Sequence, residues 1–257
     1  EERKQYIQIL LEKKKYEKKI SEVAIDYVAE HTGGKSLAFL KRAIANMTNV
    51  AIDANKEVND DLLTDTLETQ LYGEKQDNDE AYRLSVARHE AGHAYVSWKT
   101  KREPKFITIV SRGQFGGYVS YGDGEDIRNL TKEDFLNYIC QALAGRAAEM
   151  VYYDENGINT GACSDLEKAT NYAIKMICYF GMGTLGLLSM DPEHILDSPK
   201  GAEVLEEANR ILKEQMDRAI SYIKEGRQTI DRVVEVLMDK SYIQGENLTA
   251  ILEEGEQ

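Results

Sequence analysis

The chain has 257 residues, a length that fits one large domain or two small ones. Acidic residues outnumber basic ones by 45 to 32, and a net charge of -13 repels phosphate backbones, so we expect no nucleic-acid partner. The sequence has no apolar run of about 18 residues that could span a membrane and no signal-peptide core, and its three cysteines are too few for a disulfide framework.

The first 72 residues are predicted to form a helical module. Ser36 can cap a helix whose apolar residues recur at steps of three and four, namely Leu37, Leu40, Ile44, Met47 and Ala51. The segment 59–71 predicts another short helix with its leucines inward. The polar stretch 73–80 is turn-like, so we place a domain boundary there, between residues 1–72 and residues 73–257.

The second domain is predicted to combine several helices with one small sheet. Asp79 can cap a helix that runs to about Lys99, and the apolar segments 106–110 and 116–121 predict two strands joined by a turn. Thr131 is expected to start a long helix, and Ser164–Glu167 has the sequence of a capping box that opens another. A last long helix is predicted from an apolar stripe at Leu205, Ala208, Leu212, Ala219 and Ile223. The predicted fold class is therefore mainly α with a small β-sheet.

Two of the four histidines lie in the segment His89-Glu90-Ala91-Gly92-His93, an H-E-x-x-H match. On a helix, residues four apart share a face, so both imidazoles can reach one metal ion. Glu90 lies about 100° further round the helix, beside the metal rather than on it. Zinc lowers the pKa of bound water to about 7, and Glu90 could take its proton and pass it to a leaving amine. The alternative is a pair of surface histidines on a charged helix.

A catalytic zinc ion needs a third protein ligand and one open position. The metzincin continuation is excluded, because Val96 and Lys99 occupy its Gly and His positions. Four residues remain as candidates for the third ligand: Glu149, Asp165, Glu167 and His194. Spacing alone does not choose among them, although Asp165 lies in the first turn of a predicted helix, where the dipole favours a carboxylate.

Four segments in order resemble the FtsH family of AAA-linked, membrane-anchored zinc metalloproteases. They are HEAGHA at 89–94, FITIVSRG at 106–113, LAGRAAE at 143–149 and TGACSDLEKAT at 160–170. The resemblance implies that Asp165 joins His89 and His93 as a ligand of one Zn²⁺ ion per chain, with Glu90 as the general base. We expect Glu149 to hydrogen-bond a ligand histidine instead of binding the metal.

Residues 1–72 resemble, more loosely, the helical lid of the family's AAA ATPase domain, through Thr32–Leu37. The resemblance implies a helical AAA lid followed by a helical zinc-metallopeptidase domain, and a hexameric ring in the full-length parent. A phosphate loop at Gly34-Lys35-Ser36 is excluded, because Ala29 stands where that loop needs glycine. The chain also opens on Glu1 instead of Met. We therefore expect ATP and membrane contact only through parts of a parent outside this chain, with this part facing the cytoplasm or an organelle interior.

The resulting functional prediction is a zinc endopeptidase that cleaves unfolded or translocated polypeptides. The alternative is a non-catalytic, zinc-stabilised assembly or adaptor module, in which a residue such as Cys163 would complete a closed zinc site. Otherwise Cys163 is expected to be a small buried filler, and His31 and His194 to lie on the surface. The strand at 117–121 could be a sheet edge beside the metal, where it would hold an extended substrate, or an ordinary covered strand.

Overall fold

The computed structural model describes residues 2–113, 115–121, 129–154, 157–187 and 189–255. The chain divides into two compact units. Unit 1 consists of Glu1–Asp77, Val110–Phe115 and Gly122–Gly124, and unit 2 of Asn78–Ile109, Gly116–Tyr121 and Glu125–Gln257. The boundary expected after residue 72 lies close to the end of the first of these stretches. The predicted fold class, mainly α with one small sheet, is confirmed.

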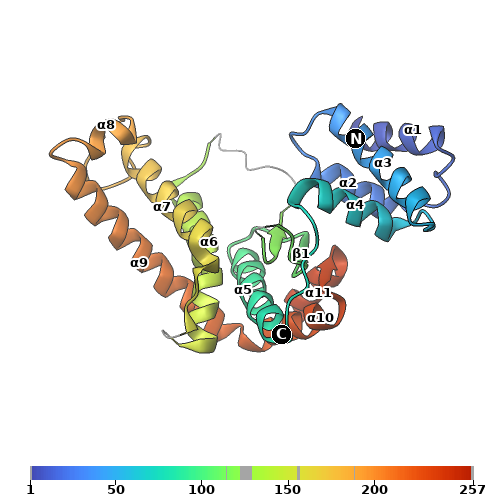
Figure 1. Cartoon of the computed structure of the whole chain (residues 1–257). Helices are drawn as coiled ribbons and strands as arrows, with labels where there is room; N and C mark the ends of the chain where they lie inside the picture. Colours follow the sequence, from blue (N-terminus) through green and yellow to red (C-terminus); the bar gives the residue numbers. More distant parts are fainter. Residues whose placement is uncertain (1, 114, 122–128, 155–156, 188, 256–257) are drawn as a thin grey trace. The chain divides into compact units, whose positions relative to one another are not determined.

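Unit 1 is built on four helices: α1 (Glu2–Lys13), α2 (Glu22–His31), α3 (Leu37–Asp53) and α4 (Asp60–Tyr72) (Figure 1). The Ser36 side chain caps α3 by accepting a hydrogen bond from the backbone N–H of Phe39, as predicted. Asn59 caps α4 in the same way. The core is formed by apolar side chains that the helical spacing brings inward, among them Ile7, Leu11, Leu40, Met47, Leu63 and Leu67.

Two expectations for unit 1 were wrong. Leu37 is 50% exposed, because it is the first residue of α3 and precedes the turns that pack inward. His31 is half-buried instead of lying free on the surface. Its ring stacks on Tyr27 at 3.9 Å between centroids, and its Nδ1 lies 2.8 Å from the Tyr27 carbonyl oxygen. Burial accordingly lowers the pKa of His31.

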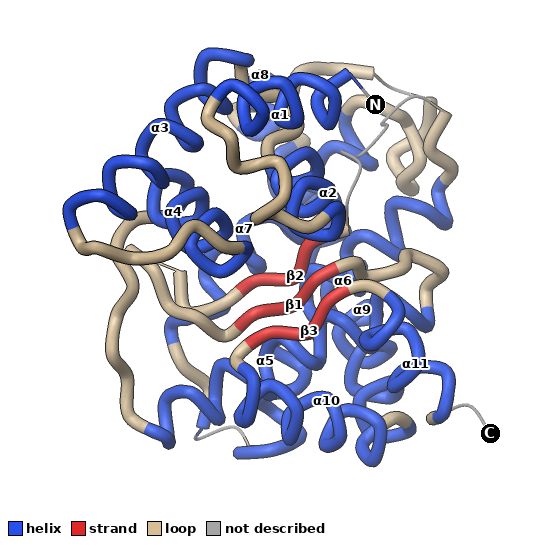
Figure 2. The backbone as a smooth tube through the Cα atoms, turned by 90° about the vertical axis from the view of Figure 1, so that its right-hand side faces the viewer, coloured by secondary structure: helices blue, strands red, loops and turns tan. Residues whose placement is uncertain are grey.

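The sheet of unit 2 has three short antiparallel strands in the order β2-β1-β3 (Figure 2). They are β1 (Phe106–Thr108), β2 (Tyr118–Ser120) and β3 (Tyr242–Gln244), and Ile107 pairs with Val119 on one side and Ile243 on the other. The sequence predicted the first two strands and missed β3. The order places β2 at an edge of the sheet.

The remaining elements of unit 2 are helices. They are α5 (Glu80–Lys99), α6 (Lys132–Tyr153), the short 3₁₀ helix η2 (Thr160–Ala162), α7 (Cys163–Cys178), α8 (Pro192–Leu196), α9 (Gly201–Glu225), α10 (Arg227–Lys240) and α11 (Glu246–Glu254). Asp79 caps α5, as predicted, and Thr131, which was expected to start a long helix, caps α6. On α9 the core face runs through Val204, Ala208 and Ile211, whereas Leu205, placed in the predicted stripe, is 52% exposed.

Helix α6 separates two apolar cores of unit 2. Its residues Cys140, Ala144 and Ala148 pack into a core shared with α5, α10 and the sheet. Ile139 and Leu143 pack into a second core shared with α7 and α9, the helices that run beside α6 in Figure 1. Small residues on α6 let α5 approach closely, and this contact carries the candidate site.

The start of α7 differs from the prediction. Ser164 was expected to cap the helix, but α7 begins at Cys163 and no side chain caps it. The turn η2 precedes it instead, and the Asn159 side chain accepts a hydrogen bond from the backbone N–H of Gly161. The 3₁₀ turn supplies the helix start that the capping box was expected to supply. Asp165 nevertheless lies in the first turn of α7, as predicted.

Across the described ranges, no helix combines the length and the apolar run that crossing a bilayer requires.

Candidate metal centre

Helices α5 and α7 both pack on α6, and together they bring two histidines and one aspartate close to one another. His89 and His93 lie one turn apart on α5, and their Nε2 atoms are 3.2 Å from each other. The Oδ2 atom of Asp165, at the start of α7, is 3.1 Å from each of these nitrogens. One ligand atom from each residue lies within 4.8 Å of the others. These three residues are called the metal group below.

Hydrogen bonds on the far side of each ring orient the two imidazoles. His89 Nδ1 lies 2.9 Å from Oε1 of Glu149, and His93 Nδ1 lies 2.8 Å from the backbone oxygen of Gln141. Both partners accept hydrogen bonds, so both rings are assigned a proton on Nδ1. When Nε2 of a ring carries no proton, its lone pair faces Asp165. Two imidazole nitrogens fixed from behind and one carboxylate form a donor set that suits zinc.

Gly145 on α6 provides the space for the two rings. A Cβ atom at this position would lie 2.3 Å from Nε2 of His89 and 2.5 Å from Nε2 of His93. Every residue other than glycine would therefore collide with the candidate ligand atoms. Glycine at this position of α6 thus permits the close approach of the helix that carries the histidines.

The pKa values of His89 and Asp165 are shifted because the two groups are partly buried and lie next to other charged groups. Burial lowers the pKa of His89, but hydrogen bonds to Asp165 and Glu149 outweigh it and raise the pKa to about 10. For Asp165, burial raises the pKa, but the charge of His93 and hydrogen bonds from the two rings bring it well below its ordinary value. Without metal, the cluster thus holds a proton on His89 next to an ionised carboxylate. A divalent cation can replace that proton and balance the carboxylate.

Glu90 lies on α5 beside the metal group and is 8% exposed. Burial raises the pKa of this carboxyl, the two neighbouring imidazoles lower it, and the Asp165 carboxylate raises it again; the net direction is upward. The backbone of Gly117, just before the edge strand β2, packs against it. A Cβ atom on Gly117 would lie 3.0 Å from Cγ of Glu90 and 2.4 Å from the Thr108 oxygen.

The other candidates for a third ligand lie elsewhere. Glu167 and His194 are exposed, and neither belongs to the metal group. Glu149 is 1% exposed and holds His89 from behind, the position that was expected for it. Cys163 is exposed, so the expectation of a buried filler was wrong. Cys163 is the first residue of α7, and its side chain lies on the outer face of the first turn.

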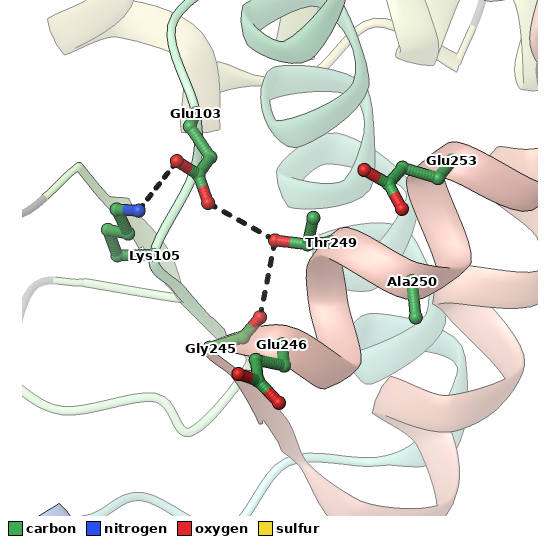
Figure 3. A pocket seen from close by; sticks show the side chains of 7 residues that line it. All are labelled: Glu103, Lys105, Gly245, Glu246, Thr249, Ala250 and Glu253. Carbon is green, nitrogen blue, oxygen red and sulfur yellow. Dashed lines mark hydrogen bonds and ion pairs between the residues drawn. The ribbon is translucent and has the colours of Figure 1, made fainter.

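A separate hollow of about 450 Å³ in unit 2 lies between the segment Glu103–Lys105 and helix α11 (Figure 3). Thr249 and Glu103 are joined by a hydrogen bond across it, and Lys105 pairs with Glu103. The residues that line it include none of the metal group. It is a surface feature apart from the candidate centre.

Two residues near the site were missed from the sequence. Gln141 orients His93 through its backbone carbonyl, and a backbone contact carries no signal in residue type. Gly117 lies against Glu90, and its signal was only the doubled glycine at 116–117 in front of a strand. Such a doubled glycine can mark a close approach of two backbones.

Known proteins resemble this chain over most of its length. Residues 77–251 match Peptidase family M41. Proteins named "ATP-dependent zinc metalloprotease FtsH" from Mesomycoplasma conjunctivae and Synechococcus sp. are 31% and 32% identical over 88% and 92% of the chain. "ATP-dependent zinc metalloprotease FTSH 8, chloroplastic" from Arabidopsis thaliana is 30% identical over 94% of it. The chain spans only 33%, 40% and 37% of the length of these three relatives. It therefore belongs to peptidase family M41, among the FtsH-type ATP-dependent zinc metalloproteases.

Proposed function

We propose that this chain is the proteolytic part of an ATP-dependent, membrane-anchored protease, and that it cleaves unfolded or translocated polypeptides as a zinc endopeptidase. One observation carries the proposal. His89, His93 and Asp165 converge on one point, with the buried carboxyl of Glu90 beside them on the same helix. Family membership supports the same reading.

In this proposal the metal group holds one Zn²⁺ ion, with Glu149 and the Gln141 carbonyl fixing the two imidazoles. When bound, zinc supplies Lewis acidity, which polarises a peptide carbonyl and acidifies water. Glu90 acts as the general base that takes a proton from water and then delivers it to the nitrogen of the leaving amine. Its raised pKa suits this work, because a carboxylate that is too acidic accepts a proton poorly.

The edge strand β2 is the proposed binding site for substrate. The edge of a sheet can pair through its backbone with an extended polypeptide, which selects little by side chain, and β2 lies at such an edge. Gly117 lies immediately before β2 and against Glu90, so a peptide paired with this edge would run close to the proposed base. This arrangement suits substrates that are unfolded and varied in sequence.

The wider setting is also proposed from the family. Unit 1 corresponds to the helical lid of an AAA ATPase domain, and ATP is used only in the full-length parent. That parent is a hexameric ring, anchored to a membrane by segments outside this chain and holding this part in the cytoplasm or an organelle interior. The relatives are named as ATP-dependent proteases, which supports the assignment.

The alternative, a non-catalytic zinc-stabilised module, would need a closed site with a fourth protein ligand. Cys163, the residue considered for that role, is exposed and outside the metal group. The geometry therefore favours the protease.

The test uses the zinc-loaded chain and casein as an unfolded substrate. Glu90→Gln should keep its zinc and lose hydrolysis by at least about 100-fold, the contribution expected of a general base. Glu167→Gln, which neutralises an exposed glutamate near Asp165, is the matched control and should cleave like the parent. Full activity of Glu90→Gln at full zinc occupancy would overturn the proposal.

A further inference from the structure

Behind the metal group lies a cluster of buried and half-buried polar residues whose side chains have no role in the proposed mechanism. It consists of Ser97, Thr100, Arg102, Tyr121 and Gln141 and is called the Arg102 cluster here. Ser97, Gln141 and Thr100 are 0%, 4% and 8% exposed. Buried polar groups of this kind persist only when they are paired, so the cluster specifies one arrangement of its members.

The guanidinium of Arg102 joins the parts of the cluster. Its carbon Cζ lies 3.9 Å from the centre of the Tyr121 ring, and its Nη1 donates to Oε1 of Gln141 at 3.2 Å. The amide nitrogen of Gln141 donates to Oγ1 of Thr100 at 2.8 Å. The Tyr121 hydroxyl lies 2.8 Å from Oγ of Ser97. One side chain thus bridges the residue that follows β2 to helix α6.

Gln141 connects this cluster to the metal group. Its backbone oxygen is the partner of His93 Nδ1, at 2.8 Å. Gln141 also precedes Gly145 by one turn of α6, so both residues face α5. A shift of α6 at Gln141 would therefore change the orientation of the His93 ring directly.

Tyr121 connects the cluster to the edge strand. It directly follows β2, and the Ser120 carbonyl accepts a hydrogen bond from the backbone N–H of Lys105 at 2.8 Å. Stacking under the guanidinium holds the Tyr121 ring in place, because a cation is attracted to the face of an aromatic ring. The end of the edge strand and the partner of His93 are thus fixed by the same side chain.

We propose that Arg102 is a positioning residue, which orients His93 for metal through Gln141 and fixes the substrate-binding edge strand through Tyr121. The proposal rests on the proposed function. Arg102 itself contacts neither metal nor substrate. Mutation of a residue that hydrogen-bonds a metal ligand typically weakens metal binding by about 10–100-fold. Arg102 is one contact further from the ligand than such a residue, so we expect its mutation to weaken zinc binding by about tenfold.

The test is the variant Arg102→Gln, studied first by competition of the metal-free protein with a zinc chelator. Arg218→Gln is the matched control. Arg218 also lies over a tyrosine ring, that of Tyr222 at 5.5 Å, and donates to a glutamine, Gln215, at 3.4 Å. Both variants remove one positive charge and the same kinds of contact, but the hydrogen-bond and ring partners named for Arg218 lie with it on α9.

Arg102→Gln is expected to bind zinc about tenfold more weakly than the parent, to shift the visible spectrum of the Co²⁺-substituted protein and to raise KM for an unfolded peptide. Arg218→Gln should change none of these. If Arg102→Gln does not fold, Gln141→Met, which keeps the side-chain length but removes both polar ends, should give the same loss of zinc affinity and the same spectral shift.

Zinc affinity of Arg102→Gln equal to that of Arg218→Gln would overturn the link to His93. Weaker zinc binding with an unchanged KM would overturn the link to the edge strand. His89→Ala separates these failures from failure of the metal site itself. If His89→Ala also leaves zinc affinity unchanged, the proposed function is wrong and not merely the role of Arg102.

Discussion

Replacement of Gly145 by alanine is the smallest change that should destroy the candidate centre. The added methyl carbon would lie 2.3 Å from Nε2 of His89 and 2.5 Å from Nε2 of His93. Ordinary contact begins near 3.4 Å, so both distances are about 1 Å too short. Neither ring can turn away freely, because Glu149 and the Gln141 carbonyl hold the opposite nitrogens.

The size of the effect follows from these contacts. Forcing an extra methyl group into a well-packed site typically costs about 1–3 kcal/mol. If this cost falls on the arrangement that binds metal, it corresponds to roughly 5–150-fold in the dissociation constant of zinc. In a helix interior, alanine is otherwise favoured over glycine by about 1 kcal/mol. The overall stability of the metal-free protein should therefore fall less than its zinc affinity.

Chelator competition measures the zinc affinity of Gly145→Ala, and urea unfolding of the metal-free protein measures its stability. Gly33→Ala is the control, because a Cβ atom there would meet nothing closer than the Glu30 oxygen at 3.5 Å. It should bind zinc like the parent. A folded Gly145→Ala protein with parental zinc affinity would refute the reasoning, since the ring nitrogens would then not be the metal-binding atoms.

Three further predictions concern the surroundings of the metal group. Because the pKa of His89 is raised from about 6.5 to about 10, its protonated form stabilises the metal-free fold fully below about pH 6.5, and this contribution is lost as the pH rises through about 10. Urea unfolding of the metal-free parent and of His89→Gln should therefore show a stability difference that shrinks from about pH 6 to about pH 10, and a constant difference would contradict the assignment. Glu149→Gln removes the charge behind His89 and should weaken zinc binding by about 10–100-fold in a chelator titration, whereas unchanged affinity would show that the contact does not tune the ligand. Cys163→Ser should leave zinc content and affinity unchanged because Cys163 is exposed, and loss of zinc on this change would favour the structural-zinc alternative.

Much of the fold was predictable because local signals decide it. The caps at Ser36 and Asp79 were each read from a polar residue in front of an apolar helical pattern, and each caps its helix in the structure. The strand β3 was missed because the apolar residues there are only Tyr242 and Ile243, whereas β1 and β2 lie within the longer segments 106–110 and 116–121. Its pairing with β1 is a long-range contact that no local pattern encodes.

For the candidate centre, the sequence predicted the two ligand histidines better than the residues that the fold places around them. His89 and His93 converge because helix geometry fixes residues four apart, a local rule. The position of Asp165 depends on how α7 packs on α6, so residue spacing left it among four candidates and only the family resemblance singled it out. The exposure of Cys163 and the contact of Gly117 with Glu90 also depend on tertiary packing, which residue types alone do not determine.

The central claim is that His89, His93 and Asp165 hold zinc in an open site. A crystal structure of the zinc-loaded chain with anomalous diffraction at the zinc edge tests it most directly. The account predicts one zinc ion bound by Nε2 of His89, Nε2 of His93 and a carboxylate oxygen of Asp165, with a remaining position open to solvent and Glu90 beside it. A zinc ion coordinated by four protein ligands, or bound by Glu149 or Cys163 in place of Asp165, would contradict the central claim.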